Sequence, residues 1–183
     1  MERGSSSASG PGSKNVPQPG APAVFVIDTS VLLAGRPIVV DGVLYATPDC
    51  VAEVQHRGRD RRMLEYLLEA GLRVISPKPA SMIAVEEASV GSGDAHRLSD
   101  ADMTALALAH ELRATIMTDD YSMQNVAATL DIPFRPVNQQ GIREVFTWQL
   151  RCVGCRKMFP GTVKECDVCG SPVKTVKTGS RPV

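Results

Sequence analysis

The sequence has no segment that would place the protein in a membrane. No apolar run approaches the roughly 20 residues that a helix needs to cross a bilayer. The first residues do not combine a charged start with an apolar stretch, as a secretory signal does. Since 43% of the 183 residues are hydrophobic, a buried core is feasible. We therefore expect a soluble, cytoplasmic protein without a membrane span.

Several signatures of catalysis are also absent. The three histidines, His56, His96 and His110, lack the H-E-x-x-H spacing of zinc peptidases. The sequence has neither a G-x-S-x-G nucleophile elbow nor a G-x-x-x-x-G-K-[ST] phosphate loop. We expect His110, on the apolar face of a predicted helix, and Cys50, beside an apolar residue, to pack in the core. These chemistries are thus disfavoured.

The charges that are present are distributed unevenly. The net charge is zero, but residues 1–148 carry 13 Lys and Arg against 18 Asp and Glu, whereas residues 149–183 carry 7 basic and 2 acidic residues. An acidic body suits bound cations, and a basic end suits contact with a polyanion. An equally open interpretation is that the lysines only keep a small module soluble.

The composition changes along the chain in a way that predicts separate domains. Residues 1–22 are rich in Gly, Ser and Pro and are expected to form a disordered leader. A pattern of strands and helices predicts a domain over residues 23–137, followed by a linker at 138–148. Crowded cysteines predict a small second domain at 149–174, and residues 175–183 are expected to be a flexible tail.

Alternating strands and helices predict the fold class of the first domain. Short apolar runs predict strands, and helix-capping residues precede the predicted helices. Strands that alternate with helices form a parallel sheet covered on both faces, so we expect an α/β fold. The strands are expected at 24–27, 43–46 (an edge strand), 72–75, 114–117 and 132–135, and the main helices at 51–70, 81–88, 99–112 and from 120 to about 130, with a polar loop at 91–96.

Acidic residues occur where this fold forms its sites, beyond the carboxyl ends of the strands. Asp28 follows the first strand, and Asp119 and Asp120 follow the strand at 114–117. Glu53 and Asp102 lie in the first turns of helices whose N-termini can face the same edge. Converging carboxylates repel one another unless a cation neutralises them, and Mg²⁺ or Mn²⁺ prefers such oxygen ligands. The pattern is typical of metal-assisted phosphodiester hydrolysis.

Each acid also has a purely structural explanation. The acids that follow the two strands can cap the next helices, Ser99-x-x-Asp102 matches a capping box, and Glu53 is favourable near a helix N-terminus. Composition alone does not show that these carboxylates converge. Both interpretations therefore stay open at this point.

Four of the five cysteines crowd into a short segment near the C-terminal end. Cys152 and Cys155 form one C-x-x-C pair, and Cys166 and Cys169 form another after ten intervening residues. In a chain without a secretory signal, this spacing favours a metal site over disulfides. Four thiolates close the tetrahedral shell of Zn²⁺, so we expect a structural zinc. The metal would stabilise a module that has little core of its own.

Basic residues and one aromatic residue surround the cysteine pairs. Positive charge combined with an aromatic ring suits contact with RNA, and docking onto another protein is the alternative. The candidate RNA-binding residues are Arg151, Arg156, Lys157, Lys164 and Phe159.

The order of these motifs resembles that of PIN-domain nucleases. The stretch from Thr118, joined to a C-terminal four-cysteine zinc ribbon at 149–174, resembles the archaeal Nob-type endonuclease family, which matures the 3′ end of small-subunit ribosomal RNA. The resemblance extends from about residue 24 to residue 174. The matching stretches are Phe25-Val-Ile-Asp28-Thr-Ser, Glu53 at a helix start, Leu98-Ser-x-x-Asp102 before Ala105-Leu-Ala-Leu, and Thr118-Asp-Asp-Tyr-Ser-x-Gln-Asn125-Val-Ala.

The resemblance implies a PIN-like parallel sheet and RNA hydrolysis with Mg²⁺ or Mn²⁺. The implied partner is precursor small-subunit ribosomal RNA within a pre-ribosomal particle. Asp100 would be an additional nearby carboxylate, and Ser30 would position a ligand or a phosphate. The implied catalytic and metal-binding acids are Asp28, Glu53, Asp102 and Asp120, with Asp119 as the alternative to Asp120.

Two other functions stay open. A catalytically inactive adaptor that binds RNA or the ribosome would keep the fold and lose acids, whereas this sequence has a carboxylate at every position. A toxin-type PIN ribonuclease would share the acids but would not need the cysteine module.

Overall fold

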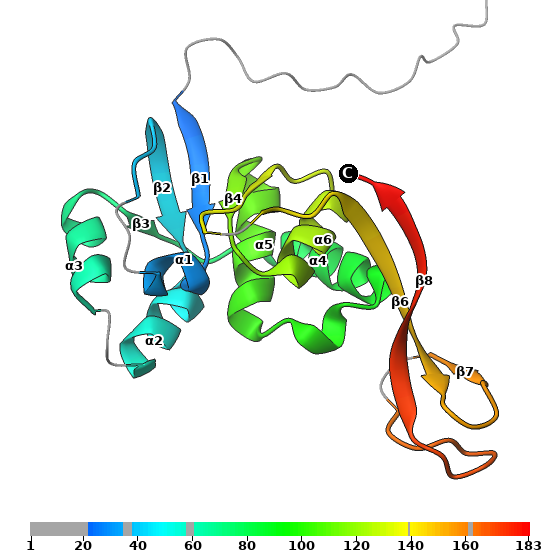
Figure 1. The fold of residues 1–183 in the computed structure, drawn as a ribbon. Helices are drawn as coiled ribbons and strands as arrows, with labels where there is room; N and C mark the ends of the chain where they lie inside the picture. Colours follow the sequence, from blue (N-terminus) through cyan, green and yellow to red (C-terminus); the bar gives the residue numbers. More distant parts are fainter. Residues whose placement is uncertain (1–21, 35–37, 58–60, 139, 161–162) are drawn as a thin grey trace, which may run out of the picture.

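A five-stranded parallel sheet forms the centre of the fold (Figure 1). The computed structural model describes residues 22–34, 38–57, 61–138, 140–160 and 163–183, so the leader expected at 1–22 lies outside them except for Pro22. The strands are β1 (Ala23–Ile27), β2 (Gly42–Ala46), β3 (Arg73–Val74), β4 (Thr115–Met117) and β5 (Phe134–Arg135). They pair in the order β3-β2-β1-β4-β5, which confirms the α/β fold.

The expected edge position of β2 is wrong. The short strand β3 pairs with the outer side of β2, where Arg73 lies opposite Tyr45 and Val74 lies opposite Ala46. The two edges of the sheet are therefore β3 and β5, each only two residues long. A strand of this length gives too short an apolar run to reveal which strand lies outermost.

Helices cover both faces of the sheet (Figure 1). Val26 and Ile116 belong to a core packed with α4, α5 and α6, whereas Ile27 and Met117 belong to a second core packed with α1, α2 and α3. Neighbouring strand residues point to opposite faces, so β1 and β4 each contribute to both cores. The helices are α1 (Thr29–Leu33), α2 (Pro48–Arg57), α3 (Arg61–Glu69), α4 (Pro79–Ser92), α5 (Asp100–Leu112) and α6 (Tyr121–Thr129).

Two expected helices differ in the structure. The single helix expected at 51–70 corresponds to two helices, α2 and α3, and residues 58–60 lie outside the described residues. The helix expected at 81–88 is longer and begins with Pro79 in its first turn. It ends at Gly93, whose left-handed backbone, with φ of 83°, closes the helix. Residues 91–92 are therefore helical rather than part of a loop.

The helix expected at 99–112 is confirmed, as is the packing role of one cysteine. α5 begins at Asp100 with Ser99 as its N-cap. Cys50 is fully buried in the core against α5, where its Sγ contacts the carbonyl oxygen of Ala101. Among the described residues, no helix is both long and apolar enough to span a membrane.

A second, antiparallel sheet projects from the body (Figure 1). Its strands are β6 (Glu144–Cys152), β7 (Met158–Phe159) and β8 (Val173–Pro182), in the order β7-β6-β8. β6 and β8 pair along nearly their whole length, and we call this pair with β7 the ribbon. β6 and β8 thus occupy residues expected as a linker and a flexible tail. The cause is an alternation of half-buried and exposed side chains along residues 146–151, typical of a strand.

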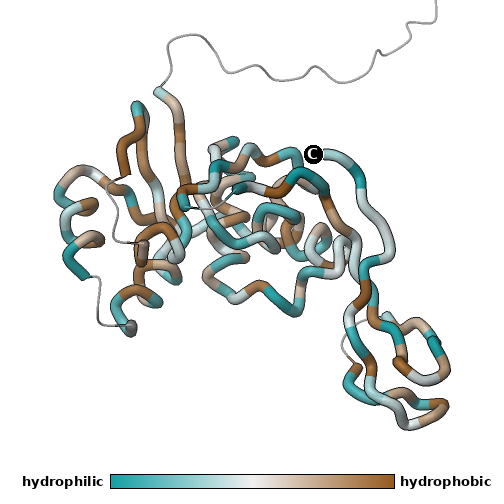
Figure 2. The backbone as a smooth tube through the Cα atoms, in the orientation of Figure 1, coloured by the Kyte–Doolittle hydropathy of each residue, from teal (hydrophilic) through white to brown (hydrophobic). Residues whose placement is uncertain are grey.

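Two buried amides attach β6 to the body. The Asn125 side chain accepts from the main-chain N–H of Phe146 at 2.6 Å and donates to its carbonyl oxygen at 2.7 Å. The Gln124 side chain accepts from Ile142 at 2.9 Å and donates to the carbonyl oxygen of Thr118 at 3.0 Å. Along the backbone, β1 and β2 are mostly hydrophobic, whereas the ribbon alternates with hydrophilic residues (Figure 2). The ribbon therefore depends on directed hydrogen bonds more than on a large apolar core.

Candidate active site and metal centre

Two adjacent strands end with acids at the same edge of the sheet. β1 pairs with β4, so Asp28 after β1 lies next to the Thr118-Asp119-Asp120 segment after β4. The N–H of Asp28 donates to the carbonyl oxygen of Met117 at 3.1 Å, which continues the pairing of the strands to the carboxylate itself. This edge is where open parallel sheets form their sites. We call it the acidic edge, with Asp28, Glu53, Asp102 and Asp120 as its carboxylates.

Asp28 is the buried centre of the acidic edge, with 2% of its surface exposed. Its Oδ2 accepts from the hydroxyls of Ser30 at 2.6 Å and Thr118 at 3.0 Å. Its other oxygen, Oδ1, is buried and has no hydrogen-bond partner among the described residues. Burial, followed by the charge of Asp102, raises the pKa of Asp28 from 3.8 to about 6, against the lowering effect of its donors.

Asp102 connects the remaining acids. It lies in the first turn of α5, where its Oδ2 accepts from the N–H of Ser99 at 2.7 Å and its own N–H donates to Ser99 Oγ at 3.2 Å. The predicted capping box is therefore formed. Burial raises the pKa of Asp102, and the charges of Asp120 and Glu53 raise it further. Asp102 can therefore cap α5 and still lie close enough to Asp120 and Glu53 to interact with their charges.

Asp119 and Asp120 have different surroundings. The carboxylate of Asp119 accepts from the main-chain N–H groups of Val137 and Asn138 at 2.9 Å each, and from Asn138 Nδ2 at 2.7 Å. Asp120 caps α6 through Oδ1, which accepts from Ser122 at 2.6 Å. Asp120 also acts on the pKa of Asp102, whereas Asp119 holds the segment after β5.

The carboxylates are neighbours without forming a closed coordination shell. Glu53 is half-buried on α2, which packs against α5. The expected first-turn position of Glu53 is wrong, because α2 begins at Pro48 and Asp49 is the acid in its first turn. Among the described residues, no three acidic side chains bring their oxygens within 4.8 Å of one another. Mutual repulsion keeps uncompensated carboxylates apart. A buried carboxylate oxygen without a donor, next to further acids, fits the oxygen ligand set of a divalent cation.

One buried polar network was not recognised in the sequence. Asp94 is 1% exposed and accepts from Ser92 Oγ at 2.8 Å and from Asn125 Nδ2 at 2.6 Å. Arg97 lies 3.8 Å from its other oxygen. Asp94 has no motif around it, and Asn125 appeared only within the resemblance. The network joins the end of α4 to β6 through the amide of Asn125.

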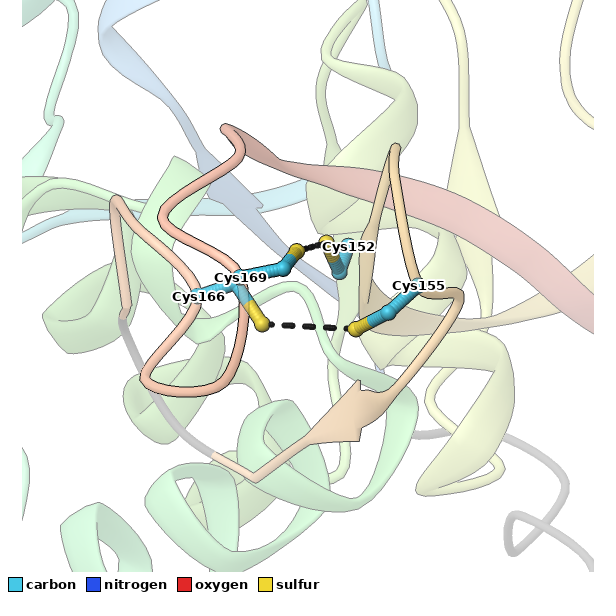
Figure 3. Close-up of side chains that lie close together, drawn as sticks. All are labelled: Cys152, Cys155, Cys166 and Cys169. Atoms are coloured by element: carbon cyan, nitrogen blue, oxygen red, sulfur yellow. Dashed lines mark hydrogen bonds between the residues drawn. The ribbon is translucent and has the colours of Figure 1, made fainter.

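The four cysteines of the ribbon come together around one point (Figure 3). All four Sγ atoms lie within 4.8 Å of one another, with Cys152 and Cys169 at 3.4 Å and Cys155 and Cys166 at 3.5 Å. These separations exceed the S–S bond of about 2.05 Å. They approach the ~3.8 Å between sulfurs that a tetrahedral ion with Zn–S bonds of about 2.3 Å requires. The cluster can therefore hold a metal ion.

Main-chain N–H groups in the turns of the two C-x-x-C pairs donate to two of the four sulfurs. The N–H of Gly154 donates to Cys152 Sγ at 3.3 Å, and the N–H of Val168 donates to Cys166 Sγ at 3.4 Å. Donors from Ser171, the hydroxyl first, lower the pKa of Cys169 to about 6. The pKa of Cys155 is instead raised to about 12, because the lowering effect of a backbone hydrogen bond at Lys157 is outweighed by the Cys166 side chain and burial. A Cβ at Gly154 would lie 2.5 Å from the Ser171 hydroxyl, so a larger residue at this position would have to displace that side chain.

The candidate RNA-binding residues lie on the surface of the ribbon. Arg151, Arg156 and Lys164 are exposed, and Phe159 is half-buried. Lys157 forms an ion pair with Asp167 at 2.7 Å, which offsets part of its charge. The basic end of the chain is therefore presented by the ribbon.

The fold and the acidic edge define a PIN-type nuclease, and comparisons with known proteins agree. A family model described as "PIN domain of ribonuclease" matches residues 25–112. The chain is 40% identical to the endoribonuclease Nob1 of Pyrococcus abyssi, covering 86% of this chain and 96% of that protein. It is 36% identical to the endoribonuclease Nob1 of Methanocaldococcus jannaschii, over 91% of this chain and 84% of that protein.

A relative of another name is similar to the same degree. The ribonuclease VapC1 of Thermoplasma acidophilum is 41% identical, over 82% of this chain and 77% of that protein. The chain belongs to the PIN-domain ribonuclease family, with archaeal Nob1 endoribonucleases among its relatives. It is therefore an endoribonuclease, and RNA is its substrate class.

Proposed function

We propose that this endoribonuclease depends on a divalent metal ion and matures the 3′ end of small-subunit ribosomal RNA. Asp28, Glu53, Asp102 and Asp120 hold Mg²⁺ or Mn²⁺ at the acidic edge. The observation that carries the proposal is Asp28 Oδ1, a buried carboxylate oxygen without a donor beside a second acid that acts on its pKa. A cation supplies the missing partner of that oxygen and lowers the repulsion among the acids.

The neighbouring residues fix the orientation of Asp28. Ser30 and Thr118 both donate to Oδ2, so Oδ1 is the oxygen that faces away from these donors. When bound, the metal activates water and offsets charge at the phosphorus. Asp119 acts as a positioning residue, because its carboxylate holds Val137 and Asn138 and thereby the backbone next to Asp120.

The cysteine cluster is proposed to hold one structural Zn²⁺. A closed shell of four thiolates offers no open position for a substrate, so the ion stabilises the ribbon and does not catalyse. We propose that the parallel-sheet domain cleaves RNA and that the ribbon binds it. The residues for this contact are Arg151, Arg156, Lys157, Lys164 and Phe159, all near the cluster.

The choice of ribosomal RNA follows the relatives and the domain content. Nob1 proteins match this chain over most of their length, and their family matures small-subunit ribosomal RNA. We propose the same substrate here, within a pre-ribosomal particle in the cytoplasm. A toxin-type activity on other RNA is the second candidate, favoured by the 41% identity to VapC1. The ribbon favours the first candidate, because a minimal toxin would not need it.

Cleavage of a defined precursor tests both the enzyme and its substrate. Purified protein is incubated with an RNA that spans the 3′ end of the small-subunit ribosomal RNA, with and without Mn²⁺. We expect a single cut near the mature end that requires Mn²⁺ and is lost in Asp28→Asn. Asp131→Asn is the matched control, because Asp131 is exposed outside the acidic edge and its left-handed backbone, with φ of 54°, suits Asn.

Three outcomes separate the alternatives. Cleavage by Asp28→Asn at the wild-type rate would refute the role of the acids. Cuts scattered over unrelated RNA would favour the toxin-type activity. Tight binding without any cleavage by the wild type would identify an adaptor instead of an enzyme.

A further inference from the structure

A cleft separates the end of α4 from the ribbon, away from the acidic edge. Its volume of about 480 Å³ lies within the range of about 300–1,000 Å³ typical of sites for small ligands. The body contributes Val90 and His96 to its walls, and the ribbon contributes Trp148, Leu150 and Phe159. The cleft therefore depends on both parts of the chain.

The walls of the cleft are aromatic, apolar and free of negative charge. The rings of Trp148 and Phe159 are each only half-buried. Met158, at 41% exposed, and Val90, at 66%, widen the apolar surface. None of the described residues that line the cleft is acidic. Such walls accept a flat, uncharged ring that is attached to a negatively charged chain.

Cations lie over both aromatic rings. The Arg97 guanidinium lies 4.4 Å from the centre of the Trp148 ring, and the Lys157 ammonium lies 5.1 Å from the centre of the Phe159 ring. Asp94 lies 3.8 Å from Arg97 and helps to hold it over the indole. Asp167 pairs with Lys157 at 2.7 Å and offsets part of its charge. Each of the two aromatic side chains is thus next to a partly compensated positive charge that can contact a phosphate.

The backbone fixes the distance between the two walls. Gly93 ends α4 with φ of 83°, and a Cβ there would collide with the carbonyl oxygen of Trp148. The body and β6 therefore meet backbone to backbone at the base of the cleft. The cleft is a fixed feature of the junction and does not depend on long side chains alone.

We propose that this cleft binds one unpaired nucleobase of the RNA substrate, stacked on Trp148 and Phe159. The inference rests on the proposed function, in which the ribbon binds RNA. Stacking on aromatic rings with cations nearby is how proteins hold single-stranded RNA. Gln149 and His96 also line the cleft and offer hydrogen-bonding groups to the edge of a base.

The position of the cleft ties this base to the acidic edge. His96 is three residues before Ser99, whose side chain caps the helix that carries Asp102. A base held beside His96 therefore sets the path of the strand toward the carboxylates. The ribbon then positions the substrate in addition to raising its local concentration.

Trp148 is the only tryptophan in the chain, so its emission reports on this cleft alone. The full zinc-loaded protein is titrated with a single-stranded RNA decamer in buffer without Mg²⁺ or Mn²⁺, and fluorescence anisotropy of the labelled RNA follows binding. We expect the decamer to quench the indole emission as it binds. A decamer of the same charge with abasic sites should bind more weakly and leave the emission unchanged.

Substitutions on each wall provide a second readout. Phe159→Ala should weaken binding of the decamer by about 5- to 150-fold, the range expected for loss of a stacking partner. His96→Ala should weaken it by about 2- to 12-fold, the range expected for loss of one hydrogen bond. Neither substitution should change binding of the abasic RNA. Tyr66→Ala is the control, because Tyr66 is 61% exposed on α3, outside the cleft. Zinc content verifies that the Phe159 variant keeps its ribbon, and His96→Ala tests the body side independently.

Binding of the decamer without a change in indole emission would overturn the inference, as would equal quenching by the abasic RNA. Failure of the proposed function is distinguishable. If the decamer quenches the Trp148 emission but the wild type never cleaves precursor RNA, the proposed catalysis is refuted and the proposed base site is still supported. Mn²⁺-dependent cleavage without quenching would refute only the base site.

Discussion

Replacing Asp28 with Asn tests the acidic edge by its effects on two quantities, the rate of RNA cleavage and the stability of the metal-free protein. The substitution keeps the shape and removes one charge. Asn is about as good a helix cap as Asp, so the N-terminus of α1 is preserved. Cleavage should fall by at least 100-fold, because the proposed metal loses its buried ligand. Without metal, however, the variant should be as stable as the wild type or more so.

The magnitude follows from the environment of Asp28. Burial raises its pKa from 3.8 to about 6, so the ionised side chain destabilises the folded state by roughly 3 kcal/mol, at about 1.4 kcal/mol for each pKa unit. Asn removes this cost but places an NH₂ donor at or near the position of Oδ1, which has no partner. An unsatisfied buried donor costs about 1–3 kcal/mol. The net gain is therefore about 0–2 kcal/mol.

The pH dependence gives the sign of the effect. The folded state binds the proton of Asp28 more tightly than the unfolded state, because its pKa is raised. The wild type is thus penalised above pH 6, and the penalty disappears as the pH falls from about 6 to about 4. The advantage of Asp28→Asn should accordingly be present at pH 7.5 and absent near pH 4.

Thermal denaturation with and without Mn²⁺ measures this difference in stability. At pH 7.5 without metal, Asp28→Asn should melt up to about 8 °C above the wild type, since 1 kcal/mol shifts a protein of this size by about 2–4 °C. Saturating Mn²⁺ should raise the melting temperature of the wild type more than that of the variant. An equal Mn²⁺ shift in both proteins, or a metal-free variant that is several degrees less stable at pH 7.5, would refute the reasoning.

The remaining predictions concern the ribbon and the positioning residues. Elemental analysis should find about one zinc per chain, and Cys166→Ser should lose it; zinc-free wild type purified under reducing conditions would contradict this. A chelator that removes the zinc should leave the helical far-UV circular dichroism signal unchanged, because the helices described all lie in residues 29–129. Complete loss of that signal would refute the division into two domains. Asn125→Ala should lower the free energy of unfolding by about 3 kcal/mol, because it leaves buried polar groups of Asp94 and Phe146 unpaired. Urea titrations measure this change, and a loss below 1 kcal/mol would contradict the role of this amide. Asp120→Asn should abolish cleavage, whereas Asp119→Asn should retain at least a tenth of it; the reverse order would make Asp119 the ligand.

The hydrophobic periodicity and the helix-capping and turn residues were sufficient to predict the sheet and the edge at which Asp28 and Asp120 lie. The buried run before Asp28 and the alternating elements predict a parallel sheet, in which the acids after β1 and β4 lie at the same edge. That these acids are neighbours follows from the pairing of β1 with β4, which the sequence did not predict. The capping pattern at Ser99 predicts the start of α5 and thus the position of Asp102. These features depend on local sequence, so one chain was enough to reveal them.

Features that depend on contacts between distant segments were not predictable in the same way. The ribbon strand β6 is anchored by Asn125, 21 residues from its partner Phe146. The Asp94 network depends on α4, α6 and β6 meeting at one point. No local pattern marks such a junction, since each residue alone is an ordinary polar residue. β6 itself is a different case, because the alternation along residues 146–151 is a local pattern typical of a strand. The linker expected at 138–148 is therefore wrong although local sequence predicts part of β6.

The structural and catalytic roles proposed for the acids support each other. Asp28 and Asp120 cap helices, and Asp102 completes a capping box. In each case the hydrogen bonds from these caps end on a single carboxylate oxygen: Oδ2 of Asp28, Oδ1 of Asp120 and Oδ2 of Asp102. One oxygen therefore fixes the side chain to a rigid helix end, and the other is the natural candidate to meet a cation. A site built in this way keeps its carboxylates in place despite their repulsion, because releasing any one of them would also unfold a helix end.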